Sequence, residues 1–174
     1  MPRIQPISYD EANRQSQETW NDQIKRGATM TNMKRTLARA PEAFGALMSW
    51  YPLYDVVSGF LGKRTTVIFC HAISAQTDCL ICETYFRKIL IEWGENPNEL
   101  SLDEWENTLV GLGRQIANEP SCVSEEQFEK LRRKLTDEQV VSLFAFAAMM
   151  VATNVFNHAM GVELDEALEK YRGK

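Results

Sequence analysis

The stretch that decides the fold runs from Ala72 to Phe86 and reads AISAQTDCLICETYF, with Cys79 and Cys82 three residues apart. Apolar sequence lies on both sides, so the cysteines sit where one helix gives way to another. Thr77 and Asp78 are both acceptable N-cap residues, which predicts that the cysteines fall in the first turn of the second helix. Backbone N–H groups at a helix start can lower the pKa of a cysteine from about 8.5 to about 3.5–7.5, whereas an ionised Asp78 would raise it. The stretch therefore predicts a reactive dithiol.

Length, composition and charge fit one soluble globular domain. The chain has 174 residues, of which 44% are hydrophobic and 25% charged. Its formal charge of −5 argues against nucleic acid or an anionic membrane as a partner. The first residues do not have the pattern of a signal peptide, and the apolar run from Val140 to Val155 is short for a bilayer. These features predict a cytoplasmic protein, in which a disulfide is more often catalytic than structural.

The first 30 residues are predicted to form a helical extension. Ser8 and Glu11 have the spacing of a capping box, which predicts a helix from there to about Lys25. This helix has few apolar residues, so we expect it on the surface. We therefore divide the chain into an extension, residues 1–30, and a main domain, residues 31–174.

Helices are expected on both sides of the dithiol. The segment from Arg64 to Ala75 is mostly apolar, and no second strand candidate exists with which its β-branched residues could pair. The dithiol helix is expected to run from Cys79 to about Trp93. Its predicted buried stripe consists of Tyr85, Phe86, Ile89, Leu90 and Trp93. The pattern predicts an all-α fold, a multi-helix bundle.

The C-terminal half carries three more capping boxes and one long apolar helix. The boxes pair Ser101 with Glu104, Ser124 with Gln127, and Thr136 with Gln139. The last helix, from Thr136 to Gly161, is apolar almost all round, which predicts that it is buried on every side. It forms either the centre of one bundle or a contact shared with another subunit.

The chain resembles the carboxymuconolactone decarboxylase / alkylhydroperoxidase D-like family, in its peroxidase-related branch. The resemblance lies in the turn and dithiol of residues 74–82, in residues 40–44 upstream, and in residues 135–140 and 157–162 near the end. It covers about residues 33–168. It implies an all-α bundle with the dithiol at the N-terminus of a core helix, assembly into homotrimers or homohexamers, and reduction of a peroxide.

By this resemblance, Cys82 is the peroxidatic thiol that becomes a sulfenic acid, and Cys79 resolves it to a disulfide. A thiol reductant of unknown identity would then restore the pair. The family has a proton relay of Glu, twelve positions before the first cysteine, and His, four after the second; here those positions hold Val67 and Phe86. Neither side chain carries a proton, so only the two cysteines can be carried over. Loss of acid–base help predicts an activity about 10²–10⁴-fold weaker.

Three nearby side chains are candidates to replace the relay. His71 lies one turn after Val67 and titrates near neutral pH, which makes it a candidate surrogate base; a hydrogen-bonded core histidine is the simpler interpretation. Tyr85, three residues past Cys82, either donates a hydrogen bond to the thiol or only packs. Glu83 points about 100° away around the helix and is expected to face solvent.

The cysteines and His71 are also residue types that bind zinc, but their spacing does not fit a zinc site. Cys70 and His71 are neighbours that point apart, and a second close-spaced pair is missing. We therefore predict no metal and no cofactor. Two functions remain: a thiol-dependent peroxidase or disulfide reductase that uses Cys79 and Cys82, and a non-catalytic or redox-sensing oligomeric scaffold that keeps the dithiol without turnover.

Overall fold

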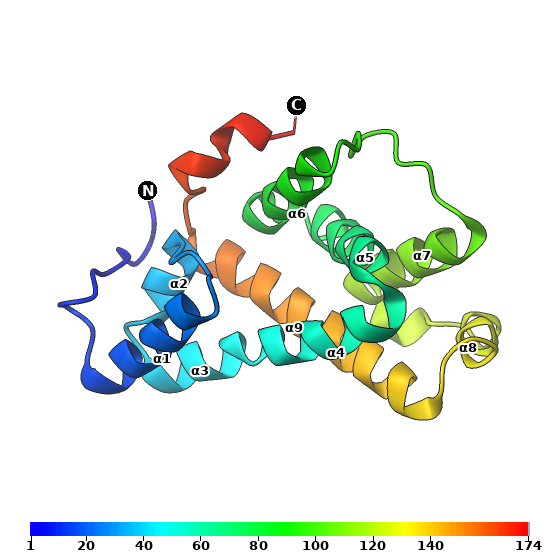
Figure 1. Cartoon of the computed structure of the whole chain (residues 1–174), viewed down its shortest axis with the longest axis horizontal. Coiled ribbons are helices and arrows are strands. Elements are labelled where there is room, and N and C mark those ends of the chain that lie inside the picture. The colour runs from blue at the N-terminus through cyan, green and yellow to red at the C-terminus, as the bar shows by residue number, and fades with distance from the viewer. Residues whose placement is uncertain (174) are drawn as a thin grey trace.

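The structure, a computed structural model that describes residues 1–173, is helical wherever those residues form regular structure (Figure 1). The α-helices are α1 (Arg14–Lys25), α2 (Asn32–Leu37), α3 (Pro41–Met48), α4 (Trp50–Leu61), α5 (Lys63–Gln76), α6 (Leu80–Glu92), α7 (Glu104–Asn118), α8 (Glu125–Arg132) and α9 (Asp137–Met160). Two 3₁₀ helices are η1 (Pro120–Cys122) and η2 (Glu166–Tyr171). The predicted all-α fold is confirmed.

The main core is built around α5, which packs against α4, α6, α7 and α9. Phe69 of α5 and Phe146 of α9 are fully buried, and their rings stack with centroids 6.5 Å apart. Trp50 of α4 stacks on Phe146 at 5.3 Å. Because aromatic side chains bury large apolar areas, this cluster fixes α4, α5 and α9 relative to one another. The turn that leads from α5 into the dithiol helix α6 is therefore held on a rigid base.

The N-terminal segment packs onto the rest of the chain through a second apolar cluster. Ile7 and Ala12 are buried there with Leu37 of α2 and Phe44 of α3. Phe156 of α9 borders the same cluster. The division into an extension and a main domain stays a prediction, because this cluster joins the two parts.

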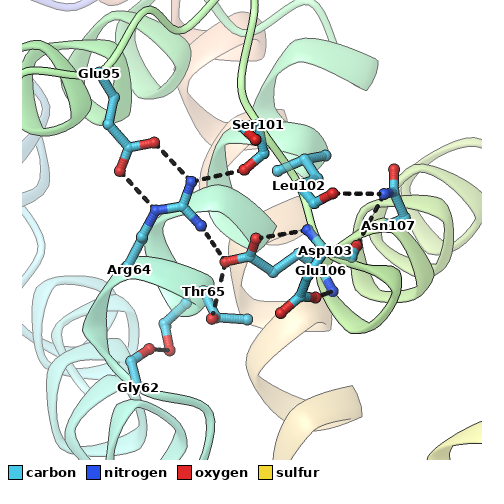
Figure 2. Close-up of polar contacts among 10 residues, drawn as sticks. Gly62, Arg64, Thr65, Glu95, Ser101, Leu102, Asp103, Glu106 and Asn107 are labelled. Atoms are coloured by element: carbon cyan, nitrogen blue, oxygen red, sulfur yellow. Dashed lines mark hydrogen bonds and ion pairs between the residues drawn. The ribbon is translucent and has the colours of Figure 1, made fainter.

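Arg64, in the first turn of α5, ties this helix to the loop before α7 (Figure 2). Its guanidinium donates to the two carboxylate oxygens of Glu95 at 2.7 and 2.8 Å, and to the Ser101 carbonyl at 3.0 Å. It also pairs with the buried carboxylate of Glu106, which forms a capping box with Asp103 at the start of α7. Hydrogen bonds to Glu95 and Glu106 raise the pKa of Arg64, so it stays charged and joins three segments.

Two predicted helix starts are wrong. The side chain of Asp103, and not that of Ser101, caps α7 and accepts from the Glu106 N–H at 2.7 Å. At the other end of the chain, Glu11 does accept from the N–H and hydroxyl of Ser8, at 2.7 and 2.8 Å. No helix begins there, however, and α1 begins only after Asn13.

The remaining two capping boxes are confirmed. The Ser124 side chain accepts from Gln127 N–H at the start of α8, and the Thr136 side chain accepts from Gln139 N–H at the start of α9. Helix α9 ends at Gly161 in the left-handed conformation, with φ of 60°. These local signals set the bounds of α9, which crosses the molecule from beside α8 toward α2 (Figure 1).

Within the single chain α9 is not buried on every side, so it is not the fully enclosed centre of one bundle, and its burial by another subunit stays a prediction. An apolar stripe along it is exposed, and it consists of Val141, Ala145, Ala148, Ala152 and Val155. Val141 is 68% exposed and Val155 58%. The opposite faces pack on α4, α5, α7 and α8. By length and composition α9 would also suffice to cross a membrane, a test that core helices of soluble proteins pass as well.

The buried face of α6 differs from the predicted one. Phe86 and Leu90 are buried and Ile89 is half-buried, whereas Tyr85 and Trp93 are 37% and 47% exposed. The buried residues of the helix are Ile81, Cys82, Thr84, Phe86, Arg87 and Leu90, so its buried face also includes the dithiol end of the helix and two polar side chains.

The closest approach of two helices gives a stability prediction. A Cβ on Gly113 of α7 would lie 3.1 Å from Ile73 and from Phe69 of α5, whereas a Cβ on Gly111 would meet nothing within 4 Å. We expect Gly113→Ala to be less stable than Gly111→Ala by about 1–3 kcal/mol, since only the first overpacks the core. Gly111→Ala itself should stabilise by about 0.5–1 kcal/mol through helix propensity. Urea unfolding of both variants measures this, and equal stabilities would contradict the packing.

Candidate functional site

The turn between α5 and α6 places both cysteines at the start of α6. Thr77 is the C-cap of α5, and its hydroxyl bonds back to carbonyls of that helix. Asp78 follows in the left-handed conformation with φ of 54°. Cys79 is the N-cap of α6, and its N–H donates to the Ser74 carbonyl at 3.0 Å. The predicted N-cap, Thr77 or Asp78, is therefore wrong, and Cys82 falls in the first turn of α6.

An amide from the distant helix α9 reaches both sulfurs. Asn157 Nδ2 lies 3.3 Å from Cys82 Sγ and 3.8 Å from Cys79 Sγ. One turn earlier, Asn154 Nδ2 donates to Thr77 Oγ1 at 2.7 Å. Asn157, Asn154 and both thiols are buried. Two asparagines thus fasten α9 to the turn that carries the dithiol, and one of them supplies a donor to the sulfurs.

The two thiols share a proton unequally. The Cys82 thiol, hydrogen-bonded to the Cys79 sulfur, is the main cause that lowers the pKa of Cys79 to about 6. The Cys82 backbone N–H, Asn157 and the nearby His158 act in the same direction, and burial acts against them. The same sulfur contact, together with burial, raises the pKa of Cys82. The opposite shifts favour loss of the pair's first proton from Cys79, so a negative charge on the reduced pair is held mainly at that sulfur.

The two sulfurs border different pockets. Cys82 lines a pocket of about 80 Å³ whose other walls are mostly apolar or aromatic, Trp50 and Phe86 among them. Cys79 lines a second pocket of about 150 Å³ together with Asn157 and His158. One thiol of the pair thus borders a mostly apolar pocket, and the other borders a more polar one.

Two tyrosines flank Cys82 in its pocket. Burial raises the pKa of Tyr51, and the charges that Tyr85 and Cys82 would carry raise it further. Burial likewise raises the pKa of Tyr85. Both therefore remain neutral phenols that can donate a hydrogen bond beside the thiol.

The structure does not bring His71 to the dithiol. It lines neither of the two pockets, and its buried Nε2 has no hydrogen-bond partner within residues 1–173. Burial and the positive charges of Arg87 and Arg114 lower the pKa of His71 to about 4. The imidazole is therefore neutral near pH 7, and its role as a surrogate base stays a prediction without a contact to support it. The relay positions Val67 and Phe86 are both buried, and Phe86 forms part of the wall beside Cys82.

Sequence reasoning did not identify Asn157, Lys34 and Tyr51 as site residues. For Asn157 a signal existed, because amides in an otherwise apolar helix need buried partners. Lys34 and Tyr51 lie more than 25 positions before Cys82 and reach its pocket only through the tertiary fold. The helical spacing of Phe44, Leu47, Met48 and Tyr51 predicts that Tyr51 faces the core, but no local pattern places Tyr51 or Lys34 beside the dithiol.

The chain has the all-helical fold of AhpD-like proteins. One solved structure with this fold is that of the debrominase Bmp8, with a TM-score of 0.78 and 18% identity over 97% of this chain and 95% of that chain. A cysteine-to-alanine variant of Bmp8 in complex with 2,3,4-tribromopyrrole has a TM-score of 0.75 and 17% identity, over 97% of this chain and 94% of that chain.

A third solved structure with this fold is the alkylhydroperoxidase AhpD core of an uncharacterized peroxidase-related protein from Ralstonia eutropha JMP134. Its TM-score is 0.70, and it is 18% identical over 96% of this chain and 94% of that chain. No family model and no curated protein matches the sequence. At these identities the likeness establishes the fold.

The unequal sharing of the proton gives a prediction for titration of the reduced protein. Thiolate absorbance in the ultraviolet should appear with a midpoint near pH 6 and be lost below it, because the pKa of Cys79 is lowered to about 6. Cys82→Ala removes the main cause, so the midpoint should move up toward the ordinary cysteine value. The exposed Cys122 is replaced by serine throughout, and Cys70→Ala, at another buried cysteine, serves as the control that leaves the midpoint unchanged. If Cys82→Ala leaves the midpoint unchanged, the Cys82 thiol is not what lowers the pKa of Cys79.

Proposed function

We propose that this protein is a thiol-dependent oxidoreductase that reduces a small organic hydroperoxide with the dithiol of Cys79 and Cys82. The observation that carries the proposal is the common donor: Asn157 Nδ2 lies within 3.8 Å of both sulfurs at the start of α6. A thiolate is the reactive form of cysteine; the lowered pKa of Cys79 supplies one at neutral pH, and this thiolate can take the proton of Cys82 as Cys82 attacks. The apolar pocket beside Cys82 favours an organic peroxide over hydrogen peroxide alone.

In the proposed reaction, Cys82 is peroxidatic because it borders the apolar pocket. Its sulfur attacks the outer peroxide oxygen while its proton passes to the Cys79 thiolate, which replaces the absent relay as base. The O–O bond breaks, Cys82 becomes a sulfenic acid, and the alkoxide leaves as the alcohol with one proton taken from solution. Cys79 then attacks the Cys82 sulfur, the S–S bond forms, and water leaves. An external thiol reductant restores the pair.

A second candidate is reductive debromination of an aromatic ring. It is favoured by the similarity in fold to a debrominase and by the aromatic walls of the pocket beside Cys82. In such a reaction the carbon–bromine bond breaks, bromide leaves, the carbon takes a proton, and the two thiols become the disulfide. Release of bromide from 2,3,4-tribromopyrrole, absent with Cys82→Ser, distinguishes it from peroxide reduction.

Reaction of single-cysteine variants with cumene hydroperoxide tests the proposed order. With Cys79→Ser, we expect a sulfenic acid on Cys82 but no disulfide, formed more slowly because the base is lost. With Cys82→Ser, neither product should form. Mass spectrometry after trapping of sulfenic acids identifies the modified residue, in the Cys122→Ser background.

Two outcomes would contradict this scheme. Sulfenic acid on Cys79 in the Cys82→Ser variant would reverse the order of the cysteines. If the unaltered dithiol reacts with the peroxide no faster than free cysteine does, the redox-sensing scaffold without turnover is favoured instead.

We also propose that the protein assembles into a homotrimer or homohexamer in the cytoplasm. The exposed apolar stripe of α9, from Val141 to Val155, supports an assembly because contiguous apolar surface of this kind commonly marks protein contacts. Val141→Lys places a charge in the stripe without touching the core and should shift the protein toward monomers. Light scattering at micromolar concentration measures the mass, and a monomeric unaltered protein would contradict the proposal.

A further inference from the structure

One charged side chain in the pocket beside Cys82 has no charged partner. Lys34 of α2 is 2% exposed and lines this pocket with Cys82, Tyr51 and Tyr85. Its Nζ lies 4.6 Å from the centroid of the Tyr51 ring. Within residues 1–173 its side chain makes no ion pair of 4.0 Å or less and no hydrogen bond. A lysine so deeply buried normally has a carboxylate or carbonyl partner.

Asp165, whose carboxylate lines the same pocket, is not the partner of the Lys34 ammonium. Asp165 Oδ1 accepts from the Asn32 N–H at 2.8 Å, and no ion pair joins Asp165 to Lys34. Burial alone lowers the pKa of Lys34 to about 8, with no contribution from Asp165. The ammonium is therefore still mostly charged at neutral pH, and among the described residues the face of the Tyr51 ring is the group that it contacts.

A second donor of this pocket also lacks an acceptor. Trp50 is part of the pocket wall, and its buried indole N–H finds no hydrogen-bond partner in the described part of the chain. Most of the remaining wall is apolar, with Leu47, Ile81 and Met150 among its side chains. The pocket thus has two donors that lack acceptors, Lys34 and Trp50, and one acceptor that lacks a donor, Asp165 Oδ2, in the described residues. An apolar molecule with one oxygen-bearing acidic group is complementary to the two donors.

We propose that this pocket binds a small organic anion, with its carboxylate or comparable acidic group at Lys34 and its apolar body against the aromatic wall beside Cys82. If the proposed function holds, the substrate class is an organic hydroperoxide that carries an acidic group, and this part of the inference rests on the proposed function. The binding itself does not need a reactive dithiol. Lys34 would select the substrate and orient it, and Cys82 would react with it.

Calorimetry with benzoate and benzamide, which have nearly the same shape and differ in charge, tests the proposal on the reduced full-length protein at pH 7. Benzoate is expected to bind about ten- to hundredfold more tightly than benzamide, as hydrogen bonds to a charged group contribute about 1.5–3 kcal/mol. Lys34→Met should abolish this preference, and Lys34→Arg should retain most of it. Lys134→Met removes an exposed lysine whose ammonium lies 5.2 Å from the Trp105 ring centroid, and it should leave the preference unchanged.

Three outcomes would each overturn the proposal. The two probes could bind with equal affinity, benzoate could fail to bind at millimolar concentration, or Lys34→Met could leave the benzoate affinity unchanged. Thermal unfolding shows whether Lys34→Met is folded, and Lys34→Arg keeps the test decisive if it is not. The same titration with Cys82→Ser separates this inference from the redox proposal. Benzoate should still bind that variant, whereas peroxide reduction should be lost.

Discussion

One buried amide, that of Asn157, joins the two parts of the site, and the rest of the site depends on it. Asn157 belongs to α9, the cysteines belong to the start of α6, and 75 residues of chain separate Asn157 from Cys82. A buried amide that donates to sulfur instead of carbonyl oxygen is held there by its helix, since α9 packs on α4, α5, α7 and α8. The aromatic stack of Trp50, Phe146 and Phe69 keeps α9 in place. Core packing and sulfur chemistry are in this way parts of the same arrangement.

The Cys82 thiol, helped by the Asn157 amide, lowers the pKa of Cys79 without a Glu or His at the positions of Val67 and Phe86. Val67 and Phe86 carry no proton, so the charge that develops on sulfur must be stabilised by neutral donors. The Cys82 thiol and N–H and the Asn157 amide serve this purpose around Cys79, and the nearby His158 favours the same charge. The pocket beside Cys82 stays apolar, and Lys34 contributes its positive charge. Charge stabilisation and the proposed substrate binding therefore involve different sides of the sulfur pair.

Much of the fold could be predicted from local sequence. The capping boxes at Ser124 and Thr136 have one candidate start each, and both helices begin there. Before α7, two overlapping boxes compete, and Asp103 with Glu106 prevails because Glu106 also pairs with Arg64 of α5, a contact no local pattern contains. Which face of α9 the single chain leaves exposed could not be read from the sequence for a similar reason, since alanine fits a buried and an exposed helix face equally well. The dithiol could be found from its spacing, whereas Lys34 and Tyr51 reach the pocket beside Cys82 only through the tertiary fold.

The most direct test of this account is the rate at which the reduced protein reacts with an organic hydroperoxide when Asn157 is replaced by leucine. Leucine keeps the volume of the side chain and removes its donor. The account predicts a fall of about tenfold or more at neutral pH, because a hydrogen bond to a charged group contributes about 1.5–3 kcal/mol. The fall should shrink as the pH is raised and the thiolate forms without help. A rate that Asn157→Leu leaves unchanged at neutral pH, in a protein that folds normally, would contradict it.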